Sequence, residues 1–283
     1  MSAPDLQPYL PWLERRERSL ETLSPVPAQL LAATLDLPAE RRPQAELPPL
    51  WHWLHFLDRT PSAQLGDDGS PRSRTLLPPI DLPQIMWAGA ETEFHKPLRL
   101  DEPAEKRSRI SDMTPREGSR GPMVFLTHEH QVLQGGELAV VERTRAVFLG
   151  AASPSAAAAP PPEPQGERER EWLVDESVLF RFSALTFNSH RIHYDLRYTT
   201  QVGGYPGLVV HGPLQAILLA ETFRQWHPGA RLTRIAFRAQ APHYCSGKVL
   251  VRGATRGAGQ YALWTCPPTG GVAMSCTVDF TAA

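Results

Sequence analysis

The sequence contains little cysteine and has no excess of charge of either sign. Only three cysteines occur, and none of them forms a Cys-x-x-Cys pair; they are Cys245, Cys266 and Cys276. This scarcity argues against a disulfide framework and against a zinc site, and it suits a reducing cytoplasm. Because the chain contains 29 basic and 30 acidic residues, no broad positive field is available to hold a polyanion. We therefore expect no nucleic-acid partner.

Long apolar runs are also absent. No apolar segment approaches the roughly 20 residues that a membrane-spanning helix needs. The N-terminal sequence, "MSAPDLQPYLPWLERRERSL", lacks the basic region followed by an apolar stretch that marks a secretion signal. The sequence therefore predicts a soluble cytoplasmic protein that is not exported and has no membrane partner.

The length and one proline-rich segment predict two domains. A chain of 283 residues exceeds the usual size of a single domain. Residues 151–171, "AASPSAAAAPPPEPQGERERE", show no apolar periodicity and carry a proline run, which is typical of an extended or flexible connector. The predicted organisation is a first domain over 1–150, a linker over 151–171 and a second domain over 172–283.

The second half contains a buried helix followed by strands. From His211 the sequence "HGPLQAILLAETFRQW" has a glycine and a proline at its start and almost only apolar residues in its first turns, which predicts a helix buried nearly all round. Four strand candidates follow it, and the last has clear period-two alternation. Upstream of the helix, "EWLVDESVLFRFSALTF" ends in a stretch that we expect to favour β-structure. The strand candidates span 232–241, 248–254, 259–266 and 271–281.

The first half resembles a looser copy of the same series. Four strand-like runs, "MWAGAETEFHKPL", "KRSRISDMT", "GPMVFLTHEHQVL" and "GELAVVERTRAVF", precede the linker. A duplicated unit is the economical interpretation, although this copy has no counterpart of the buried helix. An antiparallel sheet with one apolar face can curl around such a helix. We therefore predict an α+β fold of two such units side by side.

A short polar stretch just before the helix carries the candidate chemistry. Residues 188–195 read "NSHRIHYD", and histidine is well suited to take a proton from water and return one at neutral pH. The buried helix would direct its free N–H groups and the positive end of its dipole at whatever lies before Gly212. Such a helix end can hold a carbonyl oxygen that gains negative charge. Between the two elements lies a glycine-containing loop, "TTQVGGYPGLVV", that would let the backbone approach a ligand.

These residues resemble a known family. The pattern Asn188-x-His190-x-x-His193, followed by His211-Gly212, is similar to the hydratase 2 motif of MaoC-like enoyl-CoA hydratases. The first half, with "PPLWHWLHFL", "LGDDGSP" and "MWAGAETEFHKPL", resembles the N-terminal dehydratase-like domain of the two-domain subgroup. That subgroup includes mesaconyl- and itaconyl-CoA hydratases and mitochondrial type 2 hydroxyacyl-thioester dehydratases. The resemblance implies a double hot-dog fold, in which each sheet wraps around a central helix.

The resemblance also implies roles for individual residues. His193 matches the catalytic histidine, and the Gly212 amide matches the oxyanion donor. Asn188 stands where single-domain hydratases carry a catalytic aspartate, and an amide cannot accept a proton as a carboxylate can. We therefore expect His193 to be the sole general base and Asn188 to orient the attacking water. Candidate substrate-binding residues are Tyr205, Gly207, His211, His190, Arg234 and Arg238.

The expected activity is the hydration of a short branched dicarboxylyl-CoA. Itaconyl-, mesaconyl- and methylfumaryl-CoA are the candidates, because an arginine-rich chain with only three lysines favours a bacterial catabolic role such as itaconate degradation. The substrate would bring its own coenzyme A, with no metal or redox cofactor, and a homodimer is possible. His95, Lys96 and Arg99 are candidates for binding the distal carboxylate.

Other functions remain open at this point. A hot-dog thioesterase would hydrolyse the same thioester and release a free thiol. A 3-hydroxyacyl-thioester dehydratase of fatty-acid synthesis, acting on acyl carrier protein, would need a basic docking patch. A non-enzymatic acyl-CoA sensor would need the helix end but not the histidine.

Individual residues also have structural alternatives. Asn188 can cap a turn, Gly212 can be a plain helix cap, and the two arginines can lie on a solvated strand face. His190 with His193, or His52 with His55, is a weak metal pair without a third ligand. Trp51, Trp53 and Trp87 are expected in the core or between the domains.

Overall fold

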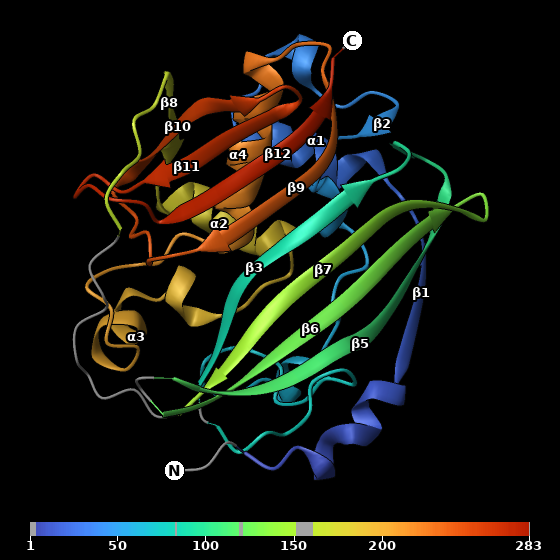
Figure 1. Cartoon of the computed structure of the whole chain (residues 1–283), viewed down its shortest axis with the longest axis vertical. Helices are drawn as coiled ribbons and strands as arrows, with labels where there is room; N and C mark the ends of the chain where they lie inside the picture. Colours follow the sequence, from blue (N-terminus) through green and yellow to red (C-terminus); the bar gives the residue numbers. More distant parts are fainter. Residues whose placement is uncertain (1–3, 83, 119–120, 151–160, 283) are drawn as a thin grey trace.

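The protein is built on one continuous antiparallel sheet of ten strands. In this computed structural model, which describes residues 4–82, 84–118, 121–150 and 161–282, the strands follow the order β1-β5-β6-β7-β3-β9-β12-β11-β10-β8 (Figure 1). The first five of these strands come from the first half of the chain and the last five from the second half. The predicted side-by-side arrangement of two sheet units is therefore confirmed.

The elements have the following bounds. The strands of the first half are β1 (Arg16–Thr22), β2 (Glu46–Leu47), β3 (Gln84–Phe94), β4 (Leu98–Arg99), β5 (Pro103–Gly118), β6 (Gly121–Gln134) and β7 (Glu137–Leu149). Those of the second half are β8 (Arg168–Val174), β9 (Arg231–Ala239), β10 (Gly247–Gly257), β11 (Gln260–Cys266) and β12 (Met274–Thr281). The α-helices are α1 (Pro25–Thr34), α2 (Glu176–Leu185), α3 (Leu196–Gln201) and α4 (Gly212–Trp226). Short 3-10 helices, η1 to η5, span Gln7–Glu14, Ala39–Arg41, Trp51–Leu54, Ser62–Gln64 and Arg191–His193.

The two halves join where β3 pairs with β9. The pairing runs from Gly89 opposite Arg238 to Glu93 opposite Arg234. Gly89 has φ of +146°, and a Cβ atom there would lie 2.1 Å from the Phe237 carbonyl oxygen. Only glycine therefore lets the two strands approach closely at this end of the seam.

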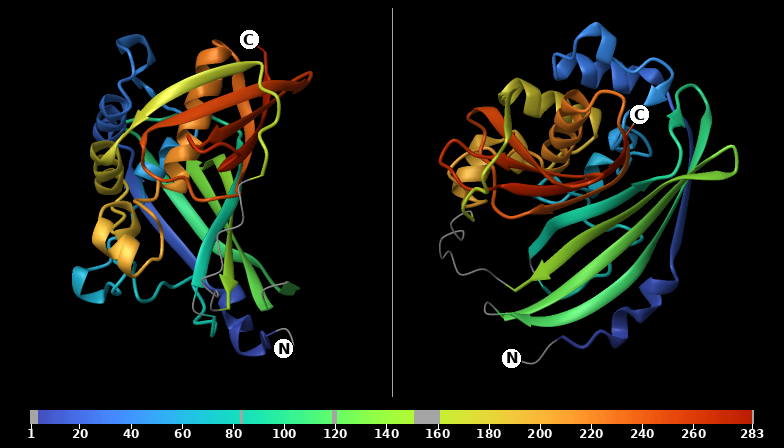
Figure 2. Two further views of the ribbon diagram at one scale, coloured as in Figure 1. Left: turned by 90° about the vertical axis from the view of Figure 1, so that its left-hand side faces the viewer. Right: turned by 45° about the horizontal axis from the view of Figure 1, so that its top comes forward.

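The helix α4 fills the concave side of the second-half sheet. Every residue from Leu214 to Phe223 is buried, as expected for a helix that is apolar all round. Figure 2 shows the strands of this half curling around it. Its dominant interaction is burial of apolar surface, at about 25 cal/mol per Å². The predicted helix and the four predicted strands of this half are confirmed, with ends that differ by a few residues.

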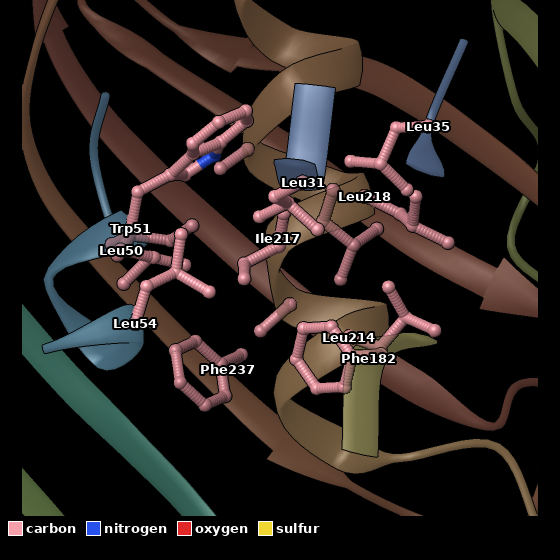
Figure 3. Close-up of a cluster of buried hydrophobic side chains, with 14 of the residues drawn as sticks. Leu31, Leu35, Leu50, Trp51, Leu54, Phe182, Leu214, Ile217, Leu218 and Phe237 are labelled. Carbon is pink, nitrogen blue, oxygen red and sulfur yellow. The ribbon is translucent and has the colours of Figure 1, made fainter. Parts of the chain in front are cut away.

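The first half has no long helix in the same place among its described residues. The N-terminal helix α1 and the 3-10 helix η3 instead cross over to the second half and pack on α4. Figure 3 shows Leu31 of α1 and Trp51 of η3 close to Ile217 of α4, and all three side chains belong to one buried cluster. The two sheet units therefore share a single core.

Two local expectations were wrong. The segment "LFRFSALTF", expected to favour β-structure, largely forms α2, whose start is capped by the Asp175 side chain accepting the Val178 N–H at 2.9 Å. This cap overrides the β-preference of the phenylalanines. Strand β8 begins at Arg168, inside the predicted linker, because it pairs with β10 along its length. Residues 151–160 of that linker lie outside the described residues.

None of the described helices has the length and hydropathy of a membrane span.

Candidate functional site

His193 is buried and held in one orientation. It ends the 3-10 helix η5, and its side chain is only 7% exposed. Its Nδ1–H donates a hydrogen bond of 2.7 Å to the Val209 carbonyl oxygen. This bond sets the tautomer and leaves the Nε2 lone pair free to accept a proton. Burial, opposed by this hydrogen bond, lowers the pKa of His193 to about 4, so the ring is neutral at physiological pH.

His211 places this imidazole beside the first turn of α4. It is the residue just before the helix, it is fully buried, and its ring stacks on that of His193 with centroids 3.7 Å apart. Its Nε2 is 2.8 Å from the Ser183 hydroxyl of α2, and its Nδ1 is buried without a partner. Burial lowers the pKa of His211 well below 6.5, so no positive charge competes with the protonation of His193.

Gly212 forms the start of α4 in contact with an aromatic side chain. A Cβ atom at this position would lie 2.6 Å from Cζ3 of Trp87, which belongs to β3 of the first half. The close packing of this indole explains the glycine. The backbone N–H of Gly212 has no acceptor within the helix, because the first four N–H groups of an α-helix have no intrahelical partner. A donor and the positive end of the helix dipole therefore lie next to His193.

Asn188 has a structural role in this arrangement. Its Oδ1 atom accepts the backbone N–H of His190 at 3.0 Å, which closes a turn of the kind that asparagine favours. The turn directs His190 edge-on toward His193, with ring centroids 5.6 Å apart. This hydrogen bond supports the structural alternative for Asn188, while its amide N–H groups and the second lone pair of Oδ1 can still contact water.

A carboxylate from the first half lies beside His190. Asp68 Oδ2 is 3.8 Å from His190 Nε2. Its loop docks on the histidine segment: the Arg191 N–H donates to the Asp68 carbonyl oxygen at 2.8 Å, and the Ser189 hydroxyl donates to the Gly69 carbonyl oxygen at 2.6 Å. The sequence marks Asp68 only through "LGDDGSP", which is part of the family resemblance and gives no separate signal for this residue.

The loop between α3 and α4 is tied to the segment before β10. The Tyr205 N–H donates to the Thr199 carbonyl oxygen at 3.0 Å, and its ring lies 6.3 Å from that of Tyr244. A Cβ at Gly207 would meet no atom within 4 Å. The loop then reaches Val209, which holds His193. This connection links Tyr205 and Gly207 to the site through the backbone, but it does not assign them a ligand.

For Arg234 and Arg238, two of the candidate substrate-binding residues, the structure favours the alternative of an outer strand face. Phe237 of β9 is buried and points to the core. Arg234 and Arg238 are each an odd number of residues from Phe237, so their side chains lie on the opposite, outer face of the sheet. Arg234 donates to Glu91 of β3 at 2.8 Å and to Asp279 of β12 at 3.0 Å. Its guanidinium is thus bound by two carboxylates across the seam, which is a structural role.

The three candidates for the distal carboxylate also lie elsewhere. His95, Lys96 and Arg99 follow the end of β3, and each has an exposed side chain beside a carboxylate, Glu93, Glu137 and Glu102 respectively. About eight residues of extended chain, roughly 25 Å, separate His95 from Trp87. They are too far from the start of α4 to contact a short acyl group there.

A polar pocket of about 210 Å³ lies on the inner face of the first-half sheet. Lys106, His130 and Glu142 project into it from β5, β6 and β7, and the segment after η3 covers it. The pocket is lined by His52, Trp53, His55, Phe56, Leu57, Asp58, Lys106, His130, Val132, Glu142 and Thr186.

Metal-binding side chains are not grouped in the described parts of the chain. No cluster of three or more histidine, cysteine, aspartate or glutamate side chains is positioned to hold an ion there. His52 and His55 are instead paired with Glu142 and Glu21, at 3.1 Å each.

Comparisons with known proteins identify the family of this chain. The sequence profile described as hydroxyacyl-thioester dehydratase type 2 matches residues 50–245. Mesaconyl-C(4)-CoA hydratase of Chloroflexus aurantiacus is 39% identical over 283 residues, which cover 99% of both chains.

Two solved structures are similar in fold. HtdX of Mycobacterium tuberculosis has a TM-score of 0.66 at 18% identity, covering 93% of this chain and 99% of that one. Another protein of that organism, described as having a double hot-dog fold, has a TM-score of 0.56 at 12% identity, covering 94% of this chain and 96% of its own. The fold is a double hot dog, and the chain belongs to the hydroxyacyl-thioester dehydratase type 2 family of MaoC-like proteins.

Proposed function

We propose that this protein is a hydro-lyase that adds water to the α,β-double bond of a short dicarboxylyl-CoA thioester. Mesaconyl-C4-CoA, itaconyl-CoA and methylfumaryl-CoA are the candidate substrates, and citramalyl-CoA-type compounds are the products. The observation that carries the proposal is the stacking of the His193 ring on that of His211, at 3.7 Å, which supports His193 as a general base acting beside the start of α4. The full-length relative named as a mesaconyl-C(4)-CoA hydratase supports the substrate class.

In this mechanism His193 is the general base. Its Nε2 atom takes a proton from water as the oxygen attacks the β-carbon, while the Nδ1–H bond to Val209 keeps the ring in place. The resulting imidazolium then returns the proton to the α-carbon. A positioned acid/base group of this kind contributes about 100- to 10,000-fold to a rate.

The start of α4 stabilises the charge that develops on the thioester oxygen. Attack at the β-carbon pushes electrons onto this oxygen, and the Gly212 N–H with the positive end of the helix dipole can stabilise the charge. One oxyanion donor is worth roughly 3 kcal/mol. The ring of Trp87 against Gly212 closes one side of the helix end to water, which strengthens these interactions.

The reaction as proposed uses the His193 side chain, the backbone N–H groups at the start of α4 and the coenzyme A carried by the substrate. We propose that it takes place in the cytoplasm, where the three cysteines, all of them free, would stay reduced. Degradation of a branched C5 diacid such as itaconate is the metabolic role that this substrate class suggests.

A panel of enoyl-CoA esters tests the proposal. Mesaconyl-C4-CoA, itaconyl-CoA, crotonyl-CoA and a long straight-chain ester should be assayed for loss of enone absorbance, for a mass gain of one water and for free thiol. The proposal expects hydration of a dicarboxylyl ester without thiol release. Thiol release would identify a thioesterase, and binding without turnover would identify a sensor.

A further inference from the structure

A bulge in β3 turns the side chain of Trp87 toward the inner face of the sheet. Ala88 is an extra residue in this strand, because its neighbours Trp87 and Gly89 lie opposite consecutive residues of β7. In a regular strand Trp87 would share the outer face with Glu91, four residues further on, which binds Arg234. The bulge reverses the alternation, and Trp87 packs on the buried core instead. Bulges that redirect a side chain in this way are common next to active sites.

The redirected indole contacts the start of α4. A Cβ atom at Gly212 would lie 2.6 Å from Cζ3 and 2.8 Å from Cε3 of Trp87. The six-membered part of the indole is therefore in van der Waals contact with the Gly212 backbone, at about 4 Å. The N–H of the same glycine is the donor that we propose for the thioester oxygen. A side chain of the first half thus adjoins the place proposed for the thioester.

The second-half side of this place is filled by buried side chains. The ring of His211 is fully buried and stacks on that of His193 at 3.7 Å. Phe182 meets the His211 ring edge-on at 5.0 Å, and the Ser183 hydroxyl lies 2.8 Å from its Nε2 atom. An acyl group bound at Gly212 therefore has no room to extend behind His211. It must extend along the first-half side, where β3 lies.

On the first-half side the indole is supported by further aromatic rings. The Trp87 ring lies 5.2 Å from that of Phe237, and the Phe237 ring lies 5.9 Å from that of Trp53. Phe237 is buried, and Trp53 is held by a hydrogen bond of 2.6 Å from its Nε1–H to Glu142. Packed interiors of this kind do not yield to extra atoms without cost. The row of rings therefore forms a wall that starts at Gly212.

The position of this wall suits a short acyl group. Trp87 is only half-buried, so its indole keeps a flat apolar surface that conjugated carbons can cover. At about 1.5 Å per bond, a four-carbon acyl group extends at most about 4.5 Å beyond its carbonyl carbon, and an eight-carbon chain about 10 Å. The short group can end beside the indole, whereas the long chain would have to displace it.

From these contacts we infer that Trp87 limits the length of the acyl group by closing the first-half side of the site. The inference rests on the proposed hydratase function and names a residue that determines its substrate specificity. It also gives the bulge at Ala88 a function, because a regular β3 would direct this indole to the outer face of the sheet.

The test compares a long ester with a short one in matched variants of β3. Values of kcat/KM for trans-2-octenoyl-CoA are divided by those for mesaconyl-C4-CoA or crotonyl-CoA, whichever the wild type hydrates faster. Loss of the indole in Trp87→Ala should raise this ratio at least about 10-fold, since a single methylene in an apolar pocket is worth roughly that much. Trp87→Phe, with a smaller ring, should raise it less. The control Met86→Ala, at a neighbouring residue that is 54% exposed, should stay within about twofold of the wild type.

The outcomes separate the two proposals. An unchanged ratio in Trp87→Ala, or equal losses toward both esters in a variant that still melts cooperatively, overturns the inference and leaves the hydratase function standing. A wild type that hydrates the octenoyl ester as fast as the short one also overturns it, as does an equal shift in Met86→Ala. If Trp87→Ala does not melt cooperatively, the ratio in Trp87→Phe decides in the same way. A wild-type protein that hydrates none of the three esters removes the function and the inference together.

Discussion

At the scale of single residues, the burial of His193 decides how it can act. With a pKa of about 4, roughly a thousand rings are neutral for each protonated one at pH 7. The base is therefore always available, but its low basicity makes it a weak proton acceptor. The helix end must then supply much of the stabilisation by drawing electrons toward the thioester oxygen. In this account His193 and the start of α4 must therefore act together.

The pH dependence of kcat/KM follows from this low pKa. Activity needs neutral His193, so it is lost as pH falls and the ring takes up a proton. With crotonyl-CoA, whose acyl group does not titrate, we expect a constant kcat/KM from about pH 8 to about pH 5 and a decline only near pH 4. Stopped assays across this range measure the profile. A decline centred near pH 6.5, the usual histidine value, would show that His193 is exposed to water or is not the base.

Asp68 supplies a negative charge beside His190, whereas the side chain of Asn188 is neutral. It comes from the first half of the chain and lies 3.8 Å from His190, which in turn faces His193 edge-on. A negative charge here favours a protonated neighbour and steadies the imidazolium that forms during the reaction. Its Oδ1 atom separately accepts the Ser70 N–H at 2.9 Å, a bond that an asparagine would keep.

Asp68→Asn should therefore lower kcat with little effect on stability. We expect a loss of about 5- to 50-fold, corresponding to roughly 1–2 kcal/mol for a partly screened charge, together with an acid limb of the pH profile at lower pH. Its neighbour Asp67 has a fully exposed side chain, so Asp67→Asn is the matched control and should leave kcat and the profile unchanged. Equal behaviour of the two variants would remove Asp68 from the site.

At the scale of elements, the first turn of α4 depends on glycine at position 212, which has no side chain. Gly212→Ala would place a methyl group against the Trp87 indole, where contacts of 2.6 and 2.8 Å leave no room. The indole or the helix must move, and a displacement of about 1 Å at a catalytic group can cost 100-fold. We expect a drop of that order in kcat/KM. The kcat/KM of the control Gly207→Ala, whose methyl group would lie in open space, should stay within about threefold of the wild-type value. Similar losses in both variants would mean that the loop, and not the start of α4, is sensitive.

Much of this element structure could be predicted from the sequence, because it follows local periodicity. The alternation from Val272 to Phe280 specifies one buried face of a strand, and the apolar run after Pro213 specifies a helix buried nearly all round; both are present in the structure. The helix α2 could not be predicted from periodicity, because the cap at Asp175 favours a helix whereas the phenylalanines favour a strand. Asp68 lies beside the histidine segment only through a long-range contact, the docking of its loop on Ser189 and Arg191, which no local pattern contains.

At the scale of the whole molecule, the seam between β3 and β9 makes one site from two halves. Arg234 crosses this seam between Glu91 and Asp279, and these carboxylates raise its pKa. The group is about one-third exposed, so solvent screens the pairs and their contribution is modest.

Replacing this arginine tests the corrected assignment. Arg234→Met should lower the free energy of unfolding by about 0.5–1 kcal/mol and leave the KM for acyl-CoA unchanged, because the side chain faces away from α4. Denaturant titration and steady-state kinetics measure the two effects. Arg238→Met, on the same face and exposed, should alter neither quantity. A raised KM in both variants would restore a role in binding coenzyme A.

The two halves divide the work in this account: the second half carries out the addition of water, and the first half shapes and holds the acyl group. The most direct test is turnover of mesaconyl-C4-CoA by His193→Gln, beside the exposed control His95→Gln, under saturating substrate and with melting temperatures recorded. We predict a loss of about 100- to 10,000-fold for His193→Gln, with a cooperative transition retained and with His95→Gln equal to the wild type. A folded His193→Gln variant that keeps most of the hydration rate would contradict the account.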